Sequence, residues 1–135
     1  IHPAILPGVR SFSLTRQGER LVITPENRKL RHVLADALGL DEVCMISCGG
    51  GSVIAAAREQ WNDGTNTLAV GPGEVIAFSR NYVTNGILRE HGVTVHEIPS
   101  AELSRGRGGP RCMSMPFLRG QDPGSRNQKS GEERL

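Results

Sequence analysis

Residues 67–98, TLAVGPGEVIAFSRNYVTNGILREHGVTVHEI, carry the clearest secondary-structure pattern in this chain. This stretch opens with two short apolar runs separated by Gly71-Pro72-Gly73, a sequence typical of a tight turn between strands. Apolar residues at helical spacing follow as far as Gly92, and a final apolar run after that glycine indicates another strand. We therefore expect a strand, a strand, a helix and a strand at residues 67–70, 74–78, 79–90 and 93–98.

The same pattern occurs earlier in the chain, which indicates an internal repeat. Residues 11–15 and 21–23 are expected to form a hairpin, because polar and apolar residues alternate around a glycine-containing turn. In that turn Gly18-Glu19 is the counterpart of Gly73-Glu74 in the second copy. Repeated supersecondary units of this kind are a signature of repeat architectures.

A helix and a strand are expected to complete the first copy. Thr24-Pro25 offers a hydroxyl cap followed by proline, the residue types that begin a helix, and the apolar stripe that follows ends at Gly39. The apolar run at 43–47 (VCMIS) then predicts a buried strand. The fold class is therefore α/β, built of ββαβ units with helices on one face of a mixed sheet. Because such a unit leaves its edges uncovered, we expect more than two units, as in part of an α/β propeller-like ring.

A glycine-rich segment, Cys48-Gly49-Gly50-Gly51-Ser52, joins the two copies. It lacks the Lys-Ser/Thr ending of a phosphate-binding P-loop, so we interpret it as a tight connection between a strand and a helix. Ser52 is expected to cap a short helix with Ile54, Ala57 and Trp61 on one side. Trp61 is accordingly expected in the core or in an interface.

Composition places the chain among ordinary globular domains. The 135 residues are 37% hydrophobic, which argues against wholesale disorder, and no apolar run approaches the roughly 18 residues that span a bilayer. We expect one domain at residues 1–118, including a short strand at 112–118, and a polar, disordered tail at 119–135. The start at Ile1 has neither an initiator Met nor a basic segment, which is typical of the interior of a longer chain.

The charge and cysteine counts narrow the class of protein further. A net charge of +2 is too balanced to indicate a nucleic-acid-binding protein by itself. Three cysteines, an odd number, favour reduced thiols and a cytoplasmic location. Cys44 and Cys48 have three residues between them, which is not the spacing of a zinc or redox motif, so no metal site is expected.

The segment RGRGGPRC, residues 105–112, contains the residue types best suited to binding a ligand and reacting with it. Positive charge beside a thiol favours the nucleophilic thiolate, and Arg111 directly precedes Cys112. Glycines such as Gly106 let the backbone approach a ligand, while arginines such as Arg107 bind carboxylates through two parallel hydrogen bonds. These residues indicate a site for an anionic group beside a reactive sulfur. Two alternatives stay open: a solvated basic loop beside an inert cysteine, and a non-catalytic module that holds nucleic acid or another anion.

At this point a family resemblance becomes specific. The segments EQWNDGTNTL (59–68), RNYVTN (80–85) and ELSRGRGGPRCM (102–113) resemble, in this order, the C-terminal portion of bacterial arginine deiminase. The similarity extends from about Ile1 to Leu118. Members of that family are much longer and fold as an α/β propeller of the pentein type, so the chain resembles a C-terminal fragment of such an enzyme.

The resemblance implies hydrolysis of L-arginine to L-citrulline and ammonia in arginine catabolism, without a metal or organic cofactor. Cys112 matches the nucleophile that forms the amidino-cysteine intermediate. Arg107 matches an arginine that binds the α-carboxylate of the substrate, and Gly106 beside it is expected to contact the substrate as well. Nucleic acid and membranes are not expected partners, whereas self-association into a homo-oligomer is possible on the exposed sheet edges of such a fragment.

The resemblance also implies that part of the catalytic site lies outside this chain. The family uses a histidine in a His-x-Asp arrangement as its general acid and base, and the four histidines here, at positions 2, 32, 91 and 96, do not match it. We interpret His32 and His91 as surface or capping residues and His96 as a strand side chain. Asp63 lies in an Asn-Asp-Gly turn, so we assign it to the turn instead of to guanidinium binding. We therefore expect the fragment alone to be inactive.

Overall fold

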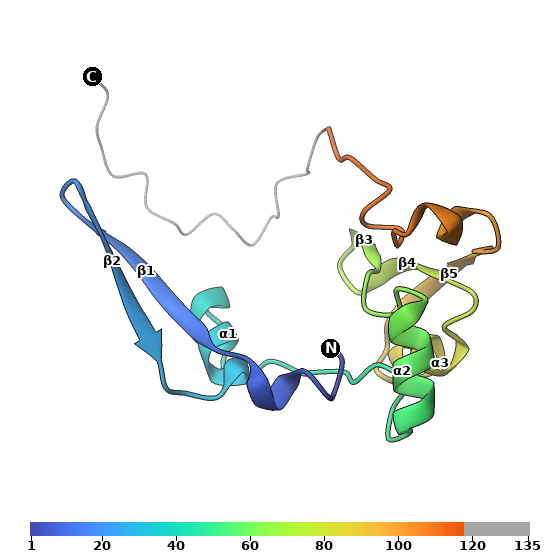
Figure 1. Ribbon diagram of the computed structural model, residues 1–135, viewed down its shortest axis with the longest axis horizontal. Coiled ribbons are helices and arrows are strands. Elements are labelled where there is room, and N and C mark those ends of the chain that lie inside the picture. The colour runs from blue at the N-terminus through green and yellow to red at the C-terminus, as the bar shows by residue number, and fades with distance from the viewer. Residues whose placement is uncertain (118–135) are drawn as a thin grey trace.

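The computed structural model describes residues 1–117, with Ser104 described by its backbone only. The elements form two parts, with the N-terminus between them (Figure 1). The first part holds β1 (Ser11–Gln17), β2 (Arg20–Glu26) and α1 (Leu30–Leu38), and the second holds α2 (Val53–Trp61), β3 (Leu68–Gly71), β4 (Glu74–Phe78), α3 (Tyr82–Glu90) and β5 (Thr94–Ile98). Two short 3₁₀ turns, Leu6–Gly8 and Leu103–Gly106, complete the described structure.

The second part is a three-stranded sheet in the order β3-β4-β5 with helices packed beside it. β3 and β4 are antiparallel, whereas β4 and β5 are parallel because α3 carries the chain back between them. Phe78 at the end of β4 is fully buried, and Ala77 and Val95 are buried beside it. The four elements expected within residues 67–98 are therefore confirmed, with ends shifted by a few residues.

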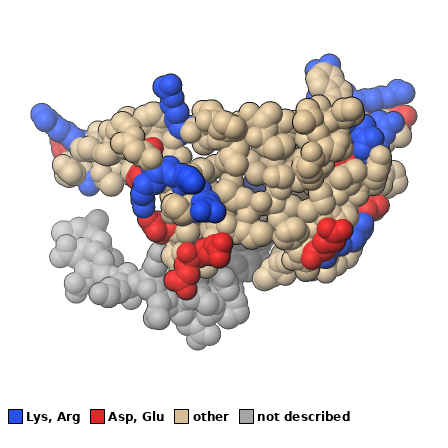
Figure 2. Space-filling view, turned by 90° about the horizontal axis from the view of Figure 1, so that it is seen from below, with Lys and Arg blue, Asp and Glu red and all other residues tan. Residues whose placement is uncertain are grey.

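The hairpin β1–β2 is also confirmed, and both strands are longer than expected. Leu14 lies opposite Ile23 in the antiparallel register, and Phe12 lies opposite Pro25. Leu14, Ile23 and Phe12 are all more than half exposed, so this face of the hairpin is not covered by the described residues. Figure 2 shows broad uncharged areas on one side of the molecule, with charged side chains in separate groups at both ends and between them.

The expected helix start at Thr24-Pro25 is wrong. β2 continues through both residues, with Thr24 opposite Ser13 in the strand register. Proline is tolerated there because, among residues 1–117, no third strand pairs with the hairpin and so none requires a backbone N–H from this position. The helix begins later, after Lys29, with no side-chain cap, and it ends as expected at Gly39 in the left-handed conformation, φ 66°.

The strand expected at 43–47 is also wrong, because within residues 1–117 that segment pairs with no strand. Its backbone hydrogen bonds are isolated: the Ile1 ammonium donates to the carbonyl of Ile46 at 2.7 Å, and the amide of Gly50 donates to the carbonyl of Ser47 at 3.2 Å. A strand is assigned only where a ladder of hydrogen bonds forms. The first copy of the unit thus lacks its last strand, and the repeat of ββαβ units in a propeller stays a prediction.

The strand expected at 112–118 is wrong where the structure describes it, and Leu118 lies outside the described residues. Residues 112–117 form a turn followed by irregular chain, and the turn is closed by the amide of Met113 donating to the carbonyl of Gly109 at 3.1 Å. The local apolar pattern predicted a strand that has no neighbour to pair with. The tail predicted at 119–135 also lies outside the described residues.

The helix expected after Ser52 is confirmed, but the side it buries is different. The Ser52 hydroxyl accepts a hydrogen bond from the amide of Ala55 at 3.2 Å, which caps α2. Ala56 and Glu59 are buried, whereas Ile54 and Trp61 are 82% and 78% exposed. Trp61 is therefore not a core residue, because α2 turns its small residues and one carboxylate toward the fold. No helix in residues 1–117 is long and apolar enough to cross a membrane.

Candidate active site

Cys112 lies at the surface, on the turn that follows the buried segment Gly108–Pro110. Its Sγ atom accepts a hydrogen bond from the side-chain amide of Asn66, with Nδ2 and Sγ 2.8 Å apart. The Cβ of Cys112 also lies 3.3 Å from where a Cβ on Gly108 would stand, so the loop folds tightly around this cysteine. An exposed thiol is accessible to molecules from solution, which is one requirement for a reactive cysteine.

The donor Asn66 stands at the end of a firmly held turn after α2. The carbonyl of Asn62 accepts from the buried amide side chain of Asn81 at 3.0 Å, and the amide of Gly64 donates to the carbonyl of Glu59 at 2.7 Å. The amide of Asn66 itself donates to the carbonyl of Asp63 at 2.9 Å. Successive bonds of this kind fix where the Asn66 side chain points. Asp63, at φ 59°, adopts the left-handed conformation that Asn-Asp-Gly turns favour, so its turn role is confirmed.

The loop that carries Cys112 packs directly on Asn66. A Cβ on Gly109 would lie 2.7 Å from the Cβ, the Cγ and the carbonyl oxygen of Asn66, closer than real side chains approach. Only glycine fits against this residue, and the glycine-rich composition of the loop has a steric reason here. The contact sets how far Cys112 lies from the amide that donates to its sulfur.

Arg107 lies beside the same turn, with its guanidinium over the ring of Trp61 at 5.5 Å from the ring centre. These two residues, with Asp63 and Arg105, line a hollow of about 280 Å³. Arg107 adopts φ 53°, and Gly106 before it has open space on its Cβ side. The hollow therefore combines two cations, one carboxylate and one aromatic face, a set suited to a zwitterionic ligand.

The sequence analysis attributed the polarity around the sulfur to arginines. In the structure the hydrogen bond to Sγ comes from Asn66, and the Arg107 guanidinium is engaged with Trp61. Arg111, next to Cys112 in the chain, is exposed. Asn66 was quoted within the resemblance but not singled out as a site residue, because a single asparagine in a turn carries no motif.

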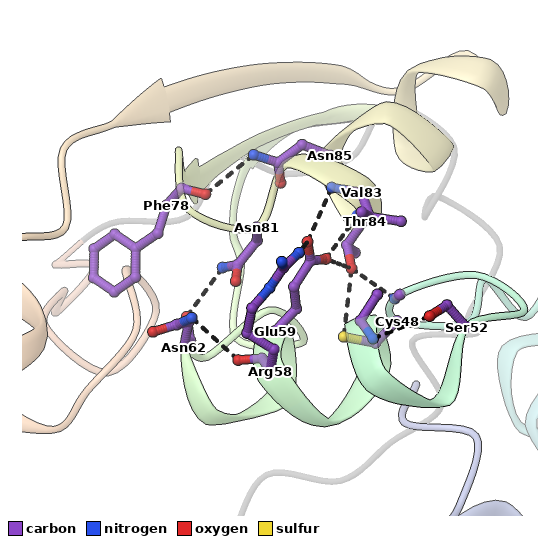
Figure 3. A network of polar contacts seen from close by, with 12 residues as sticks. Cys48, Ser52, Arg58, Glu59, Asn62, Phe78, Asn81, Val83, Thr84 and Asn85 are labelled. Atoms are coloured by element: carbon purple, nitrogen blue, oxygen red, sulfur yellow. Dashed lines mark hydrogen bonds and ion pairs between the residues drawn. The ribbon is translucent and has the colours of Figure 1, made fainter.

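A buried polar network joins α2 and the start of the turn at Asn62 to α3 (Figure 3). Glu59, on α2, is fully buried and accepts hydrogen bonds at the first turn of α3: from the amide of Val83 at 3.0 Å, from the amide of Thr84 at 2.8 Å and from the Thr84 hydroxyl at 2.6 Å. A carboxylate at a helix N-terminus satisfies amides that lack a partner within the helix. The network therefore holds α2, which ends at the turn that leads to Asn66, against α3.

The neighbours of Glu59 extend this network to solvent and to the glycine-rich connection. Arg58 donates to Glu59 at 3.2 Å, and a hydrogen bond to the Tyr82 side chain, followed by the bond to Glu59, raises the pKa of the Arg58 guanidinium. The Sγ atom of the buried Cys48 lies 3.4 Å from the Thr84 hydroxyl oxygen, whose proton is donated to Glu59. Cys48 is thus an interior thiol, in contrast to the exposed Cys44 and Cys112.

Three of the four histidines lie where the sequence placed them, at a helix end, on a strand and at the surface. His91 ends α3, and its Nδ1 lies 2.8 Å from the carbonyl of Ile87, while His96 on β5 pairs with Glu74 at 2.6 Å. His32 is exposed on α1. Within the described part of the chain, no three His, Cys, Asp or Glu side chains come close enough to hold a metal ion.

Comparison with known proteins identifies the family. The family model described as arginine deiminase matches residues 1–119, which include Cys112, Asn66 and the Arg105–Arg111 loop. The chain belongs to the arginine deiminase family. Arginine deiminase of Bacillus cytotoxicus is 56% identical over 124 residues, and arginine deiminase of Streptococcus sanguinis is 53% identical over 119 residues.

These relatives also show how much of an arginine deiminase is present. Each alignment covers 88% of this chain but only 30% of the Bacillus protein and 29% of the Streptococcus sanguinis protein. Arginine deiminase of a Streptococcus pneumoniae strain gives the same coverage at 53% identity. The chain therefore spans about 30% of the length of the curated relatives that it matches.

Proposed function

We propose that this chain is the C-terminal part of an enzyme that hydrolyses L-arginine to L-citrulline and ammonia, with Cys112 as nucleophile. The observation that carries the proposal is the exposed Cys112 sulfur, within the matched residues 1–119, which accepts a hydrogen bond from the Asn66 side chain at 2.8 Å. The names of the relatives, at 53–56% identity, support the substrate class. The proposal also takes the whole enzyme to be a cytoplasmic hydrolase of the pentein type, an α/β propeller of ββαβ units.

The proposed reaction has two steps, and both take place at the guanidinium carbon of the substrate. The Cys112 thiolate adds to the guanidinium carbon of arginine, so that a C–S bond forms. The C–N bond to a terminal nitrogen then breaks, and that nitrogen takes up a proton from a general acid and leaves as ammonia. Water next adds to the amidino-cysteine and loses a proton to the general base. The C–S bond breaks with its electron pair on sulfur, and citrulline leaves.

Arg107 and Gly106 are proposed to hold the amino-acid end of the substrate. A guanidinium group binds a carboxylate through two parallel hydrogen bonds, and the hollow next to Trp61 has room for that group. The open space at Gly106 lets a ligand approach the backbone there. In this arrangement the α-carboxylate is anchored while the guanidinium end extends to the sulfur.

The proposal divides the catalytic groups between this segment and the rest of the enzyme. This segment supplies the nucleophile and the carboxylate-binding arginine. None of its four histidines is followed by x-Asp, so the acid and base and the guanidinium-binding carboxylates are assigned to residues outside it. We therefore expect no citrulline from the 135-residue chain alone.

The test compares two single substitutions in the complete protein that contains this segment. Cys112→Ala is expected to abolish citrulline formation, because no other group replaces the attacking sulfur. Cys44→Ala is the matched control, since Cys44 is also an exposed free thiol but does not line the hollow that holds Arg107 and Arg105. Undiminished citrulline formation by the Cys112→Ala enzyme would overturn the assignment.

A further inference from the structure

We infer that Asn66 is a positioning residue for the reaction, donating a hydrogen bond to the Cys112 sulfur that stabilises negative charge on that atom during the attack and again when the covalent intermediate breaks down. The inference rests on the proposed function, in which Cys112 is the nucleophile. It adds a residue from a different part of the chain, 46 positions away from the cysteine.

The first argument is the contact itself. The Nδ2 of Asn66 lies 2.8 Å from Sγ of Cys112, within the range of a good hydrogen bond, and the amide donates. A thiolate accepts such a bond more strongly than a thiol does, because hydrogen bonds to charged acceptors are about twice as strong as neutral ones. The amide therefore favours the ionised sulfur. Because the amide is uncharged, it does not repel the cationic guanidinium group of the arginine substrate.

The second argument is that the donor is rigidly placed before any substrate binds. Asn66 ends the turn that is fastened by the Gly64–Glu59 backbone bond and the Asn81–Asn62 bond, and Gly109 packs against it with no room for a side chain. Donors fixed in advance stabilise developing charge without reorganising during the reaction. The turn that ends at Asn66 and the loop that contains Gly109 thus fix the position of the Cys112 sulfur together.

The third argument concerns the second half of the reaction. When the C–S bond of the amidino-cysteine breaks, the electron pair returns to sulfur, and an amide N–H next to that atom stabilises the leaving thiolate. Asn66 contacts sulfur and not the hollow lined by Arg107, Arg105, Asp63 and Trp61. Loss of its amide should therefore lower kcat far more than it raises KM.

The test uses Asn66→Asp in the complete protein, because aspartate keeps the shape of asparagine but has no N–H to donate. We expect kcat for citrulline formation to fall by about 10- to 100-fold, the loss expected for a hydrogen bond to a charged atom, with KM changed by less than about 3-fold. Asn66→Ala, which removes the donor without adding a negative charge, should lie between Asn66→Asp and the unchanged enzyme. A role in packing alone predicts the reverse order, since Ala alters the shape and Asp does not. Asn27→Asp, at an exposed asparagine before α1, is the matched control and should leave both constants unchanged.

A second readout does not depend on turnover. Iodoacetamide alkylation near pH 7.5, resolved for each cysteine by mass spectrometry, should slow by about 3- to 10-fold at Cys112 in Asn66→Asp and stay the same at the exposed Cys44. The buried Cys48 reports folding, because it reacts only if the structure opens. If Cys48 becomes reactive in Asn66→Asp, the structure of that variant has opened. The alkylation rate of Cys112 is then compared between Asn66→Ala and the unchanged protein.

The outcomes separate this inference from the proposed function. Unchanged Cys112 alkylation and unchanged kcat in both Asn66 variants would overturn the role of Asn66 while leaving Cys112 as nucleophile. Full activity of Cys112→Ala would instead overturn the proposed function. A rise in KM with kcat unchanged would mean that Asn66 binds substrate and does not position sulfur.

Discussion

The carboxylate of Glu59 and the hydroxyl of Thr84 are 2.6 Å apart in the interior, where Glu59 is fully buried. The same carboxylate accepts two amides at the start of α3, so one side chain of α2 caps a helix that lies 25 residues later in the chain. A buried carboxylate with several donors holds its partners in place, because each of them would otherwise lose its hydrogen bond. The turn that carries Asn66 follows directly from the helix that Glu59 anchors.

The first prediction follows from this cap. Glu59→Gln places an amide, itself a donor, where the first amides of α3 need an acceptor, and it should reduce the free energy of local opening of α3 by about 2–4 kcal/mol. Hydrogen exchange of α3 amides, followed by mass spectrometry in the complete protein, measures this opening. Glu90→Gln, at an exposed position of the same helix, is the control and should change exchange little. Equal protection of α3 in both variants would show that the buried carboxylate is not needed.

A second prediction contrasts two glycines. Gly49 has φ 69°, and a Cβ there would lie 2.2 Å from the backbone nitrogen of Ala56, so Gly49→Ala should prevent α2 from packing as it does. Gly86 lies inside α3 with nothing within 4 Å of its Cβ position, so Gly86→Ala should stabilise the protein by about 0.5–1 kcal/mol. Soluble yield and urea unfolding midpoints of the two variants test both statements. A Gly49→Ala protein as stable as the unchanged one would contradict the packing described here.

The elements within residues 67–98 could be predicted because their signals are local. Gly71-Pro72-Gly73 and Gly92 mark where the chain turns or a helix ends, and the sheet strands pair with neighbours inside the same stretch. The expected strand at 43–47 had the right apolar residues but lacks a partner in the described residues, and no local pattern reveals that. Thr24-Pro25 carried a helix-start signal that strand pairing with β1 overrode.

The candidate site, like the fold, could be predicted from the sequence only in part. Cys112 and Arg107 came from a residue pattern and a family resemblance, and the structure gives Cys112 the exposure that a nucleophile needs. Asn66 could not be found in this way, because its contact with the sulfur joins positions 46 residues apart and depends on how the turn after α2 packs against Gly109. Contacts of this kind depend on tertiary structure, which local spacing does not encode.

A third prediction concerns pH and the hairpin. The Ser13 hydroxyl, which donates to Glu26 across the strands, and secondarily Arg28 lower the pKa of Glu26 from its ordinary value of 4.5. Since the folded pKa lies below the unfolded one, the stabilisation is complete above pH 4.5 and is lost as the pH falls through the lower folded value. Exchange of β1 and β2 amides, corrected for its intrinsic pH dependence, should rise in that acidic range. In Ser13→Ala the acid dependence should weaken, and an unchanged acid response would mean that this hydrogen bond is not its source.

The last prediction separates the shape of the loop from the chemistry of its residues. Gly109→Ala adds one methyl group that would lie 2.7 Å from Asn66, so the loop must move away and carry Cys112 from the amide that donates to it. Citrulline formation by the complete enzyme should fall by at least about 10-fold, although every polar group of the site is retained. Hydrogen exchange of α2 and α3 should stay as in the unchanged protein, because the network around Glu59 is not touched. Gly51→Ala, at a glycine with open space around its Cβ position, is the control and should keep full activity. Full activity of Gly109→Ala would mean that the distance between Asn66 and Cys112 does not matter for the reaction.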